Sequence, residues 1–270
     1  MENKSLITPE ELLTLLDGYG HEFDAFQRCL TELQRSIQNT PGIREDMAQC
    51  NLIPRLMKYF TMHSHHSNLM LCMIHFLQSV VIYDEKSNAE FQSEIVKSGL
   101  WRHILDAAKD GNEEIHDEWC KLTSILCYDY PFARHEENQL EMVQSGALDT
   151  VVEMIKLRNT PQSYIIGSKT IVDLCYKNVF KATNIDRAIK LDVIVLLSMG
   201  LHLFYKDLLV VQGISNVFFY FVMANPEATK NGMIQSSTFD RLQSCLAYPR
   251  IDIQTVYYIL RIAEVVLRDD

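Results

Sequence analysis

The sequence is poor in glycine and has none of the short motifs that mark common enzyme sites. It contains ten glycines in 270 residues, no G-x-S-x-G motif and no glycine-rich loop followed by lysine. Such motifs position a serine nucleophile or cradle phosphate groups, so their absence removes familiar routes to hydrolase and nucleotide-binding function. We therefore expect a protein that is not an enzyme and that holds no cofactor.

Clusters of positive charge are also missing. The chain has 25 Lys and Arg against 35 Asp and Glu, a formal net charge of −10, and its cations are dispersed. Proteins that bind phosphate backbones or anionic lipids concentrate Lys and Arg on one surface. We therefore expect neither nucleic acid nor an anionic membrane as the partner.

No cysteine pair has the C-x-x-C spacing, and no secretory signal opens the chain. Seven cysteines, an odd number lying far apart, are typical of buried free thiols in a reducing compartment. The opening residues, MENKSLITPEELL, contain no apolar stretch of the kind that a signal peptide requires. These features predict a cytoplasmic protein, with the nucleus as the alternative. The cysteines are Cys29, Cys50, Cys72, Cys120, Cys127, Cys175 and Cys245.

One apolar run raises the question of a membrane helix. Residues 208–224 contain no charged side chain. However, Gln212, Ser215 and Asn216 lie near the centre of the run, where polar groups are costly in lipid. Asp207 and Pro226 bound it, as expected for a central buried helix, so we predict no membrane insertion.

A turn and the helix after it recur along most of the chain. The stretch VQSGALDTVVEMI around Gly146 has counterparts at Asn51, Gly99, Asp192 and Ser237, at successive spacings of 48, 47, 46 and 45 residues. All five positions carry residues that tolerate tight turns or cap helices. The apolar residues that follow each position recur at i, i+3, i+4 and i+7, the stripe of an amphipathic helix. These stripe positions are Ile53, Leu56, Met57, Phe60; Trp101, Ile104, Leu105, Ala108; Leu148, Val151, Val152, Ile155; Ile194, Leu197, Ser198, Leu201; and Phe239, Leu242, Gln243, Leu246.

A further helix completes each repeat. In the third repeat it starts at Thr160-Pro161, a cap followed by proline at the first helical position. Its predicted core stripe contains Ile171, Leu174 and Cys175, and DEWCKLTSILCYD aligns with it in the second repeat. No segment alternates with period two over a strand's length, so the fold class is all-α.

Helical units of 45 to 48 residues stack because no single unit buries its apolar face alone. The pattern V-x-S-G-A-L-x-x-V-V followed by a longer helix resembles the armadillo repeat over roughly residues 40–268, most closely in the third unit. The resemblance implies a right-handed α-solenoid, or superhelix, of about five armadillo-like repeats whose third helices line a concave groove. Residues 1–40 open with a capping box at Thr8-Pro9-Glu10-Glu11 and are interpreted as an N-terminal helical cap. The solenoid then covers residues 41–270 as one continuous domain, with units at about 44–87, 88–138, 139–183, 184–229 and 230–270.

The resemblance also indicates which residues face the groove. In armadillo proteins that import basic cargo, third helices carry a Trp and, four residues later, an Asn that together clamp an extended peptide. Here the Trp positions fall on Lys121, Lys169 and Gln212. The Asn positions fall on Ile125, Asp173 and Asn216, and only Asn216 matches, so import of basic cargo loses its main support. The two lysines suggest a groove of some positive character for acidic or helical segments; lysines that merely keep an exposed face solvated are the alternative. The predicted partner-binding residues are Lys121, Lys169, Asp173, Gln212 and Asn216.

Three clusters of reactive side chains have structural interpretations. His63, His65 and His66 lie in a predicted loop, and no Cys, Asp or Glu nearby completes a metal site. Cys127 falls on an apolar stripe, so Cys120 and Cys127 are interpreted as core thiols. The acids of KDGNEEIHDE are typical of a solvated helix start, with docking of a basic partner segment as the alternative. We assign no catalytic and no metal-binding residue.

These observations together predict a non-enzymatic protein-interaction scaffold or adaptor that binds a peptide or helical segment of another protein in its groove. Three alternatives remain open at this point. They are a nuclear transport adaptor, an all-α enzyme with an unrecognised site, and a structural segment of a larger scaffold. In the last case, copies would self-associate through their end helices, which the apolar final helix DIQTVYYILRIAEVVLRDD suggests.

Overall fold

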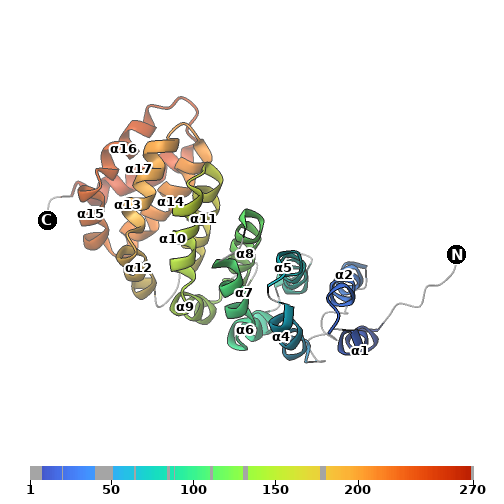
Figure 1. The fold of residues 1–270 in the computed structure, drawn as a ribbon. Coiled ribbons are helices and arrows are strands. Elements are labelled where there is room, and N and C mark those ends of the chain that lie inside the picture. Colours follow the sequence, from blue (N-terminus) through green and yellow to red (C-terminus); the bar gives the residue numbers. More distant parts are fainter. Residues whose placement is uncertain are drawn as a thin grey trace. The chain divides into compact units, whose positions relative to one another are not determined.

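The computed structural model describes residues 8–19, 21–39, 51–63, 65–83, 86–87, 89–109, 112–129, 133–176 and 181–268. Almost all of these residues are helical (Figure 1). Their contacts group the chain into two compact units, an N-terminal unit (residues 1–138) and a C-terminal unit (residues 139–270).

The N-terminal unit begins with two helices that precede the repeats and continues with the helices of the first two repeats. Its helices are α1 (Pro9–Tyr19), α2 (Phe23–Asn39), α4 (Leu52–His63), α5 (Ser67–Val81), α6 (Ala89–Lys97), α7 (Leu100–Lys109) and α8 (Glu113–Leu126). Two short antiparallel strand pairs follow α5 and α8: β1 (Ile82–Tyr83) with β2 (Lys86–Ser87), and β3 (Tyr128–Asp129) with β4 (Ala133–Arg134). Each strand has two residues, too few to show as a period-two pattern in the sequence.

The C-terminal unit contains three successive three-helix repeats, the first of which begins with α9 at the unit boundary. Its helices are α9 (Glu136–Gln144), α10 (Ala147–Arg158), α11 (Pro161–Cys175), α12 (Lys181–Lys190), α13 (Val193–Phe204), α14 (Leu208–Ala224), α15 (Pro226–Gln235), α16 (Thr238–Leu246) and α17 (Ile253–Val266).

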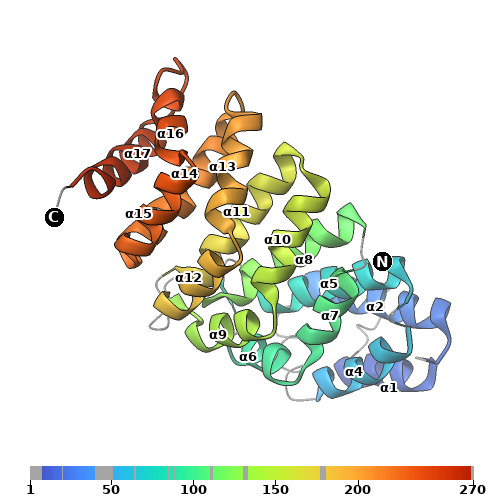
Figure 2. The ribbon, with the colours of Figure 1, turned by 60° about the vertical axis from the view of Figure 1, so that its left-hand side comes forward.

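Equivalent helices of successive repeats pack side by side within each unit. The third helices of the N-terminal unit follow α2 in the stack α2–α5–α8, and those of the C-terminal unit form the stack α11–α14–α17 (Figure 2). The second helices α10, α13 and α16 form a separate layer in the C-terminal unit. Each unit is therefore a short helical solenoid, as the repeated sequence pattern predicts.

The turn before each second helix is built on a left-handed residue. The angle φ is 53° at Asn51, 89° at Gly99, 101° at Gly146, 58° at Asp192 and 52° at Ser237. Gly, Asn and Asp enter this region at the lowest cost because it crowds a Cβ atom against the following carbonyl. The five positions that recur in the sequence are thus the five left-handed residues that directly precede the second helix of each repeat.

Helix starts follow the capping signals in the sequence. Thr8 and Glu11 exchange hydrogen bonds at the start of α1, where the Thr8 backbone N–H donates to Glu11 Oε2 at 2.8 Å. Thr160 and Ser163 form the equivalent capping box at α11, with Pro161 in the first turn. Asp207 accepts hydrogen bonds from backbone amides at the start of α14, so this uncharged helix begins and ends where the sequence predicts.

The predicted apolar stripes form the core. All of the twenty stripe positions are buried except Met57, Phe239, Gln243 and Leu246. Ser198, a polar member of the stripe, is buried, and its hydroxyl donates to the Ile194 carbonyl at 2.8 Å. Within the described residues, no helix combines the length and the apolar character needed to cross a membrane.

Buried amide side chains, which the periodicity did not reveal, tie first helices to third helices. Each donates from its Nδ2 or Nε2 atom to a carbonyl in the last turn of a third helix, and all four residues are 0% exposed. The bonds satisfy carbonyls that a helix end leaves without a partner. They are Gln92 to Ile125 at 3.1 Å, Asn138 to Leu126 at 3.1 Å, Gln139 to Asp173 at 2.5 Å and Asn184 to Leu174 at 2.8 Å.

Candidate functional site

The third helices of the C-terminal unit form one surface, which we call the third-helix surface: the partly or fully exposed side chains of α11, α14 and α17. Its central helix, α14, contains no charged residue. Gln212, Asn216, Phe219 and Tyr220 of α14 are partly exposed, and Met223 is 48% exposed. The middle of this surface therefore presents amide, aromatic and aliphatic groups.

Lys169 and Asp173 on α11 form an ion pair one helical turn apart. Lys169 Nζ lies 2.9 Å from Asp173 Oδ2, and the side chains are 67% and 3% exposed. The carboxylate is therefore covered by protein, while the ammonium group reaches the surface. The positive character expected of Lys169 is reduced by this neighbour, and Asp173 has a structural role besides any contact with a partner.

Lys121 of the N-terminal unit lies in a polar cluster between α5 and α8. Its Nζ is 2.5 Å from Glu118 Oε1, and His75 Nε2 is 3.4 Å from Glu118 Oε2. Gln78 also donates to Glu118 Oε2 at 3.1 Å. Burial raises the pKa of the Glu118 carboxyl, but the hydrogen bonds from Lys121 and Gln78 and the nearby charges outweigh burial and hold that pKa below its usual value. Lys121 is thus paired within α8 and is not an isolated surface cation, while Glu118 joins α8 to α5.

The helix caps correct the alignment of the fourth repeat. Counted from the N-caps Asn112, Thr160 and Asp207, the ninth residue is Lys121, Lys169 and Asn216. Asn216, not Gln212, therefore occupies the position equivalent to Lys169, and Gln212 lies one turn earlier on α14. The sequence alignment had therefore placed the fourth repeat four residues too early on α14.

Asn216 has an unsatisfied amide oxygen at this surface. Its Oδ1 atom is buried and has no hydrogen-bond partner among the described residues, although the residue as a whole is partly exposed. A buried acceptor without a donor is costly and is commonly satisfied by a ligand or by water. The five predicted partner-binding residues, Asn216 included, stay a prediction.

A cluster of aromatic rings, which sequence reasoning missed, crosses all three third helices. The Tyr176 ring at the end of α11 lies 4.0 Å from that of Tyr220 on α14. Phe219 stacks on Tyr258 of α17 at 4.9 Å and contacts Tyr257 at 6.0 Å. Burial, followed by hydrogen bonds with Tyr176 and Tyr258, raises the pKa of the Tyr220 hydroxyl, so the hydroxyl stays protonated and acts as a hydrogen-bonding group.

The histidine cluster packs on aromatic rings. His63 is 8% exposed and stacks on Phe26 at 5.6 Å, and His66 lies 4.3 Å from Phe23. No group of three or more metal-ligating side chains occurs in the part of the chain that the structure describes. His63 and His66 thus contribute to packing between α2 and the α4–α5 turn.

The cysteines and the acidic stretch also have structural roles. Cys120 and Cys127 are 1% and 0% exposed, which confirms the prediction of core thiols. Burial raises the pKa of the Cys175 thiol, and a protonated thiol is a poor nucleophile. Glu113 and Glu114 form the first turn of α8 behind the Asn112 cap, where acids are favourable. Cys29 and Cys72 are partly exposed, so the expectation of buried thiols is wrong for these two, and Cys50 lies outside the described residues.

Comparison with solved structures identifies the fold. A designed armadillo repeat protein in complex with the peptide (KR)4 matches 96% of this chain and 98% of its own, with a TM-score of 0.73 and 12% identity. The chain has the armadillo-repeat fold. A second designed armadillo repeat protein has a TM-score of 0.72 over 96% of this chain and 99% of its own, also at 12% identity. An engineered protein has a TM-score of 0.75 over 97% of this chain and 59% of its own, again at 12% identity.

No family model and no curated protein matches the sequence of this armadillo-repeat chain. At 12% identity, the structural likeness shows the fold alone. Its repeats end in α5, α8, α11, α14 and α17, and α1 and α2 precede them; their role as an N-terminal cap stays a prediction. The last of these helices exposes Ile253, Tyr257 and Leu260, and the expected self-association through end helices stays a prediction.

Proposed function

We propose that this chain is a non-enzymatic protein-interaction scaffold whose third-helix surface holds a segment of a partner protein. The observation that carries the proposal is the aromatic cluster on α11, α14 and α17, next to the partly exposed Asn216 on α14. Partly exposed aromatic rings with polar neighbours are characteristic of surfaces that contribute strongly to binding.

The proposed ligand is an extended segment with aromatic or aliphatic side chains. The designed armadillo repeat protein similar to this chain is in complex with the basic peptide (KR)4. On this chain, the Asp173 carboxylate is covered and paired with Lys169, and Glu264 pairs with both Arg261 and Arg268. Carboxylates that are already paired offer little to a basic peptide, whereas the uncharged α14 surface suits apolar side chains. The partly exposed side-chain amide of Asn216 would hydrogen-bond a backbone group of the segment.

A peptide-library selection against the intact chain tests the proposal, followed by affinity measurement on selected peptides by fluorescence anisotropy. We expect Tyr257→Ala and Asn216→Ala each to weaken binding by about tenfold, because each removes a group that contacts the segment. Tyr257 is 52% exposed, so its removal leaves the core intact.

Tyr205→Ala is the matched control. Tyr205 is 45% exposed but lies at the end of α13, outside the third-helix surface. Its removal is expected to change affinity by less than about twofold. Selected peptides that tolerate both third-helix substitutions, or a selection that yields no peptide, would show that this surface is not a binding site.

A further inference from the structure

The side chain of Asn216 presents its amide nitrogen, and not its oxygen, at the third-helix surface. Its Oδ1 atom is buried, while the residue as a whole is partly exposed. Its Nδ2 atom is not buried and makes no hydrogen bond within the described residues. The group that reaches solvent is therefore an NH2 group, which only donates hydrogen bonds. Gln212, one turn earlier and also partly exposed, can donate as well as accept.

The carboxylates of the three third helices are paired within the chain. Asp173 pairs with Lys169, and Glu264 pairs with both Arg261 and Arg268. The Lys169 side chain is 67% exposed, so its ammonium group adds further N–H donors beside the covered Asp173. The third-helix surface is therefore matched to a ligand that offers hydrogen-bond acceptors.

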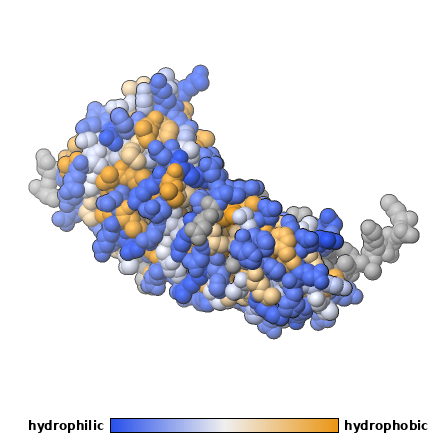
Figure 3. Space-filling model, viewed as in Figure 1, coloured by the Kyte–Doolittle hydropathy of each residue, from blue (hydrophilic) through white to orange (hydrophobic). Residues whose placement is uncertain are grey.

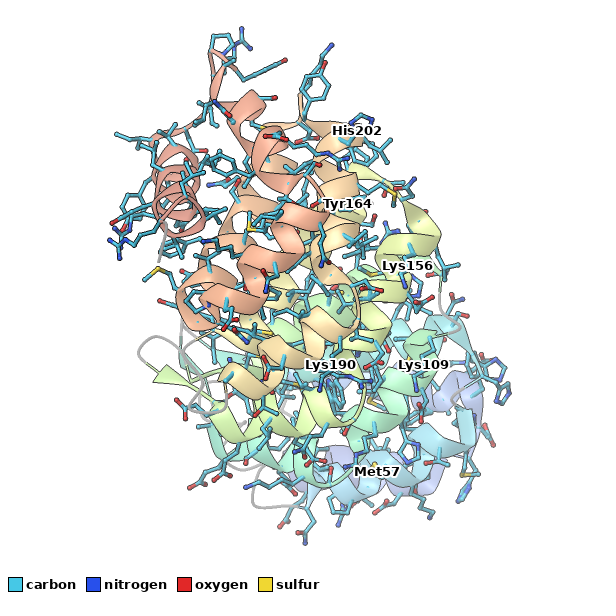
Figure 4. The ribbon with its side chains drawn as sticks, turned by 90° about the vertical axis from the view of Figure 1, so that its left-hand side faces the viewer. Met57, Lys109, Lys156, Tyr164, Lys190 and His202 are labelled. Atoms are coloured by element: carbon cyan, nitrogen blue, oxygen red, sulfur yellow. The ribbon has the colours of Figure 1, made fainter. Side chains whose placement is uncertain are left out.

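Aromatic rings accompany these donors on all three third helices. Tyr176, Phe219 and Tyr220 are partly exposed, and Tyr257 is 52% exposed. The rings of Tyr176 and Tyr220 lie 4.0 Å apart, and those of Phe219 and Tyr257 lie 6.0 Å apart. Tyr164, the other tyrosine of α11, is 0% exposed and belongs to the core (Figure 4). The surface thus combines ring faces from neighbouring helices with hydrogen-bond donors.

The aliphatic face of α13 lacks this combination. Figure 3 shows hydrophobic residues over α13, where Val195, Met199 and Leu203 are 53%, 42% and 46% exposed. These side chains have no hydrogen-bond donor and no aromatic ring. The α13 face therefore sets no requirement on a ligand beyond apolar character, whereas the third-helix surface requires both acceptors and groups that pack on rings.

We infer that the segment held by the third-helix surface is rich in proline and adopts the polyproline II conformation, an inference that rests on the proposed function. A proline residue has a backbone carbonyl but no N–H, so a proline-rich segment offers acceptors to a surface of donors. Its pyrrolidine rings pack on aromatic faces, as in other aromatic-lined sites that bind proline-rich segments. Because the polyproline II conformation is largely formed before binding, little ordering cost opposes the contact.

The repeat of a polyproline II helix also matches the spacing of packed α-helices. Polyproline II advances about 3.1 Å per residue with three residues per turn, so one turn covers about 9 Å. The axes of packed helices lie about 8–10 Å apart, whereas two residues of a β-strand advance only about 6.6 Å. A polyproline II segment that crosses α11, α14 and α17 therefore presents an equivalent face to each helix. Nine residues, about 28 Å, span the three helices.

Binding of fluorescein-labelled nonaproline to the intact chain, measured by fluorescence anisotropy, tests the inference. The matched control peptide is nonaproline made of D-proline, which has the same composition and the same lack of N–H groups but the opposite helical hand. We expect saturable binding of the L-peptide and binding of the D-peptide that is weaker by about tenfold or more, because only the L-peptide can align its carbonyls and rings with the surface.

Two substitutions locate the contact. Tyr257→Ala should weaken binding of the L-peptide by about tenfold, because it removes an exposed ring. Asn216→Asp should weaken it by a similar factor of about ten, because it replaces the exposed donor by an acceptor that repels the peptide carbonyls. Tyr205→Ala, 45% exposed but outside the third-helix surface, should change affinity by less than about twofold. Circular dichroism should show the helicity of the parent chain in all three variants.

The outcomes separate this inference from the proposed function. Equal binding of the L- and D-peptides overturns the inference, as does binding of the L-peptide that Tyr257→Ala and Asn216→Asp leave unchanged. If nonaproline fails to bind while a selected proline-free peptide binds and loses affinity in Tyr257→Ala, the inference is wrong and the proposed function stands. If neither nonaproline nor any selected peptide binds, both are wrong.

Discussion

At the scale of single residues, the left-handed turn at Gly146 gives the most direct test of the repeat. A Cβ added at Gly146 or at Gly18 meets no atom within 4 Å, but only Gly146 has a positive φ, of 101°. Gly146→Ala should therefore lower the free energy of unfolding by about 1 kcal/mol. Gly18→Ala, within helix α1, should raise it by about 0.5 kcal/mol. Urea unfolding of both variants checks this contrast in sign.

Glu118 is the residue with the clearest dependence on pH. Its pKa lies below the usual value, so its ion pairs stabilise the folded state above the usual carboxyl pKa and are lost as pH falls through the lowered one. Glu118→Gln should cost roughly 1 kcal/mol at pH 7. At a pH below the lowered pKa, the parent and the variant should become equally stable. A deficit that persists unchanged in acid would contradict the role of the Glu118 charge.

At the scale of elements, the buried amides that link first to third helices make a strong stability prediction. Asn184 is 0% exposed and donates to the Leu174 carbonyl at 2.8 Å, at the end of α11. Asn184→Leu leaves that carbonyl buried without a donor and should cost about 2 kcal/mol. Thr183→Ala, at the exposed neighbouring position, should cost much less. Thermal or urea unfolding of the two variants distinguishes these outcomes.

The sequence pattern predicted the helices but not the buried hydrogen bonds that connect them. The turn residues and apolar stripes recur at fixed spacing, so the helices and most of the core were predictable from period alone. The spacing of 47 residues from Gln92 to Gln139, and of 46 from Asn138 to Asn184, follows the same repeat. However, polar residues in an amphipathic helix are expected to face solvent, so periodicity gave no reason to place these amides inside.

The candidate site was less predictable than the fold. The aromatic cluster joins Tyr176, Phe219 and Tyr258, which come from three different helices and share no sequence motif. The family resemblance correctly placed Lys169 and Asn216 on third helices. However, it misaligned the third helix of the fourth repeat by one helical turn. Contacts between repeats depend on loop lengths and ring orientations, and neither follows from an apolar period.

At the scale of the whole molecule, the stacking of repeats predicts that a destabilising substitution affects mainly the repeats near it. In a solenoid each repeat contacts only its neighbours, so a defect should spread through adjacent repeats and fade with distance along the chain. The division of the contacts into two compact units leads to the same expectation. Damage placed in α13 should therefore loosen the C-terminal unit before it affects helices such as α2 and α5.

Gly200 offers such a defect. A Cβ at this position would overlap the ring of Tyr164, a fully buried residue of α11, so Gly200→Ala forces the ring to move and should cost about 1–3 kcal/mol. Hydrogen exchange should then accelerate in α10, α11, α13 and α14 while α2 and α5 keep most of their protection. Met199→Ala, one residue earlier but 42% exposed, should leave every helix protected. Equal loss of protection in α2 and α5 would mean that the two units unfold as one, because only coupling along the entire chain carries a defect that far.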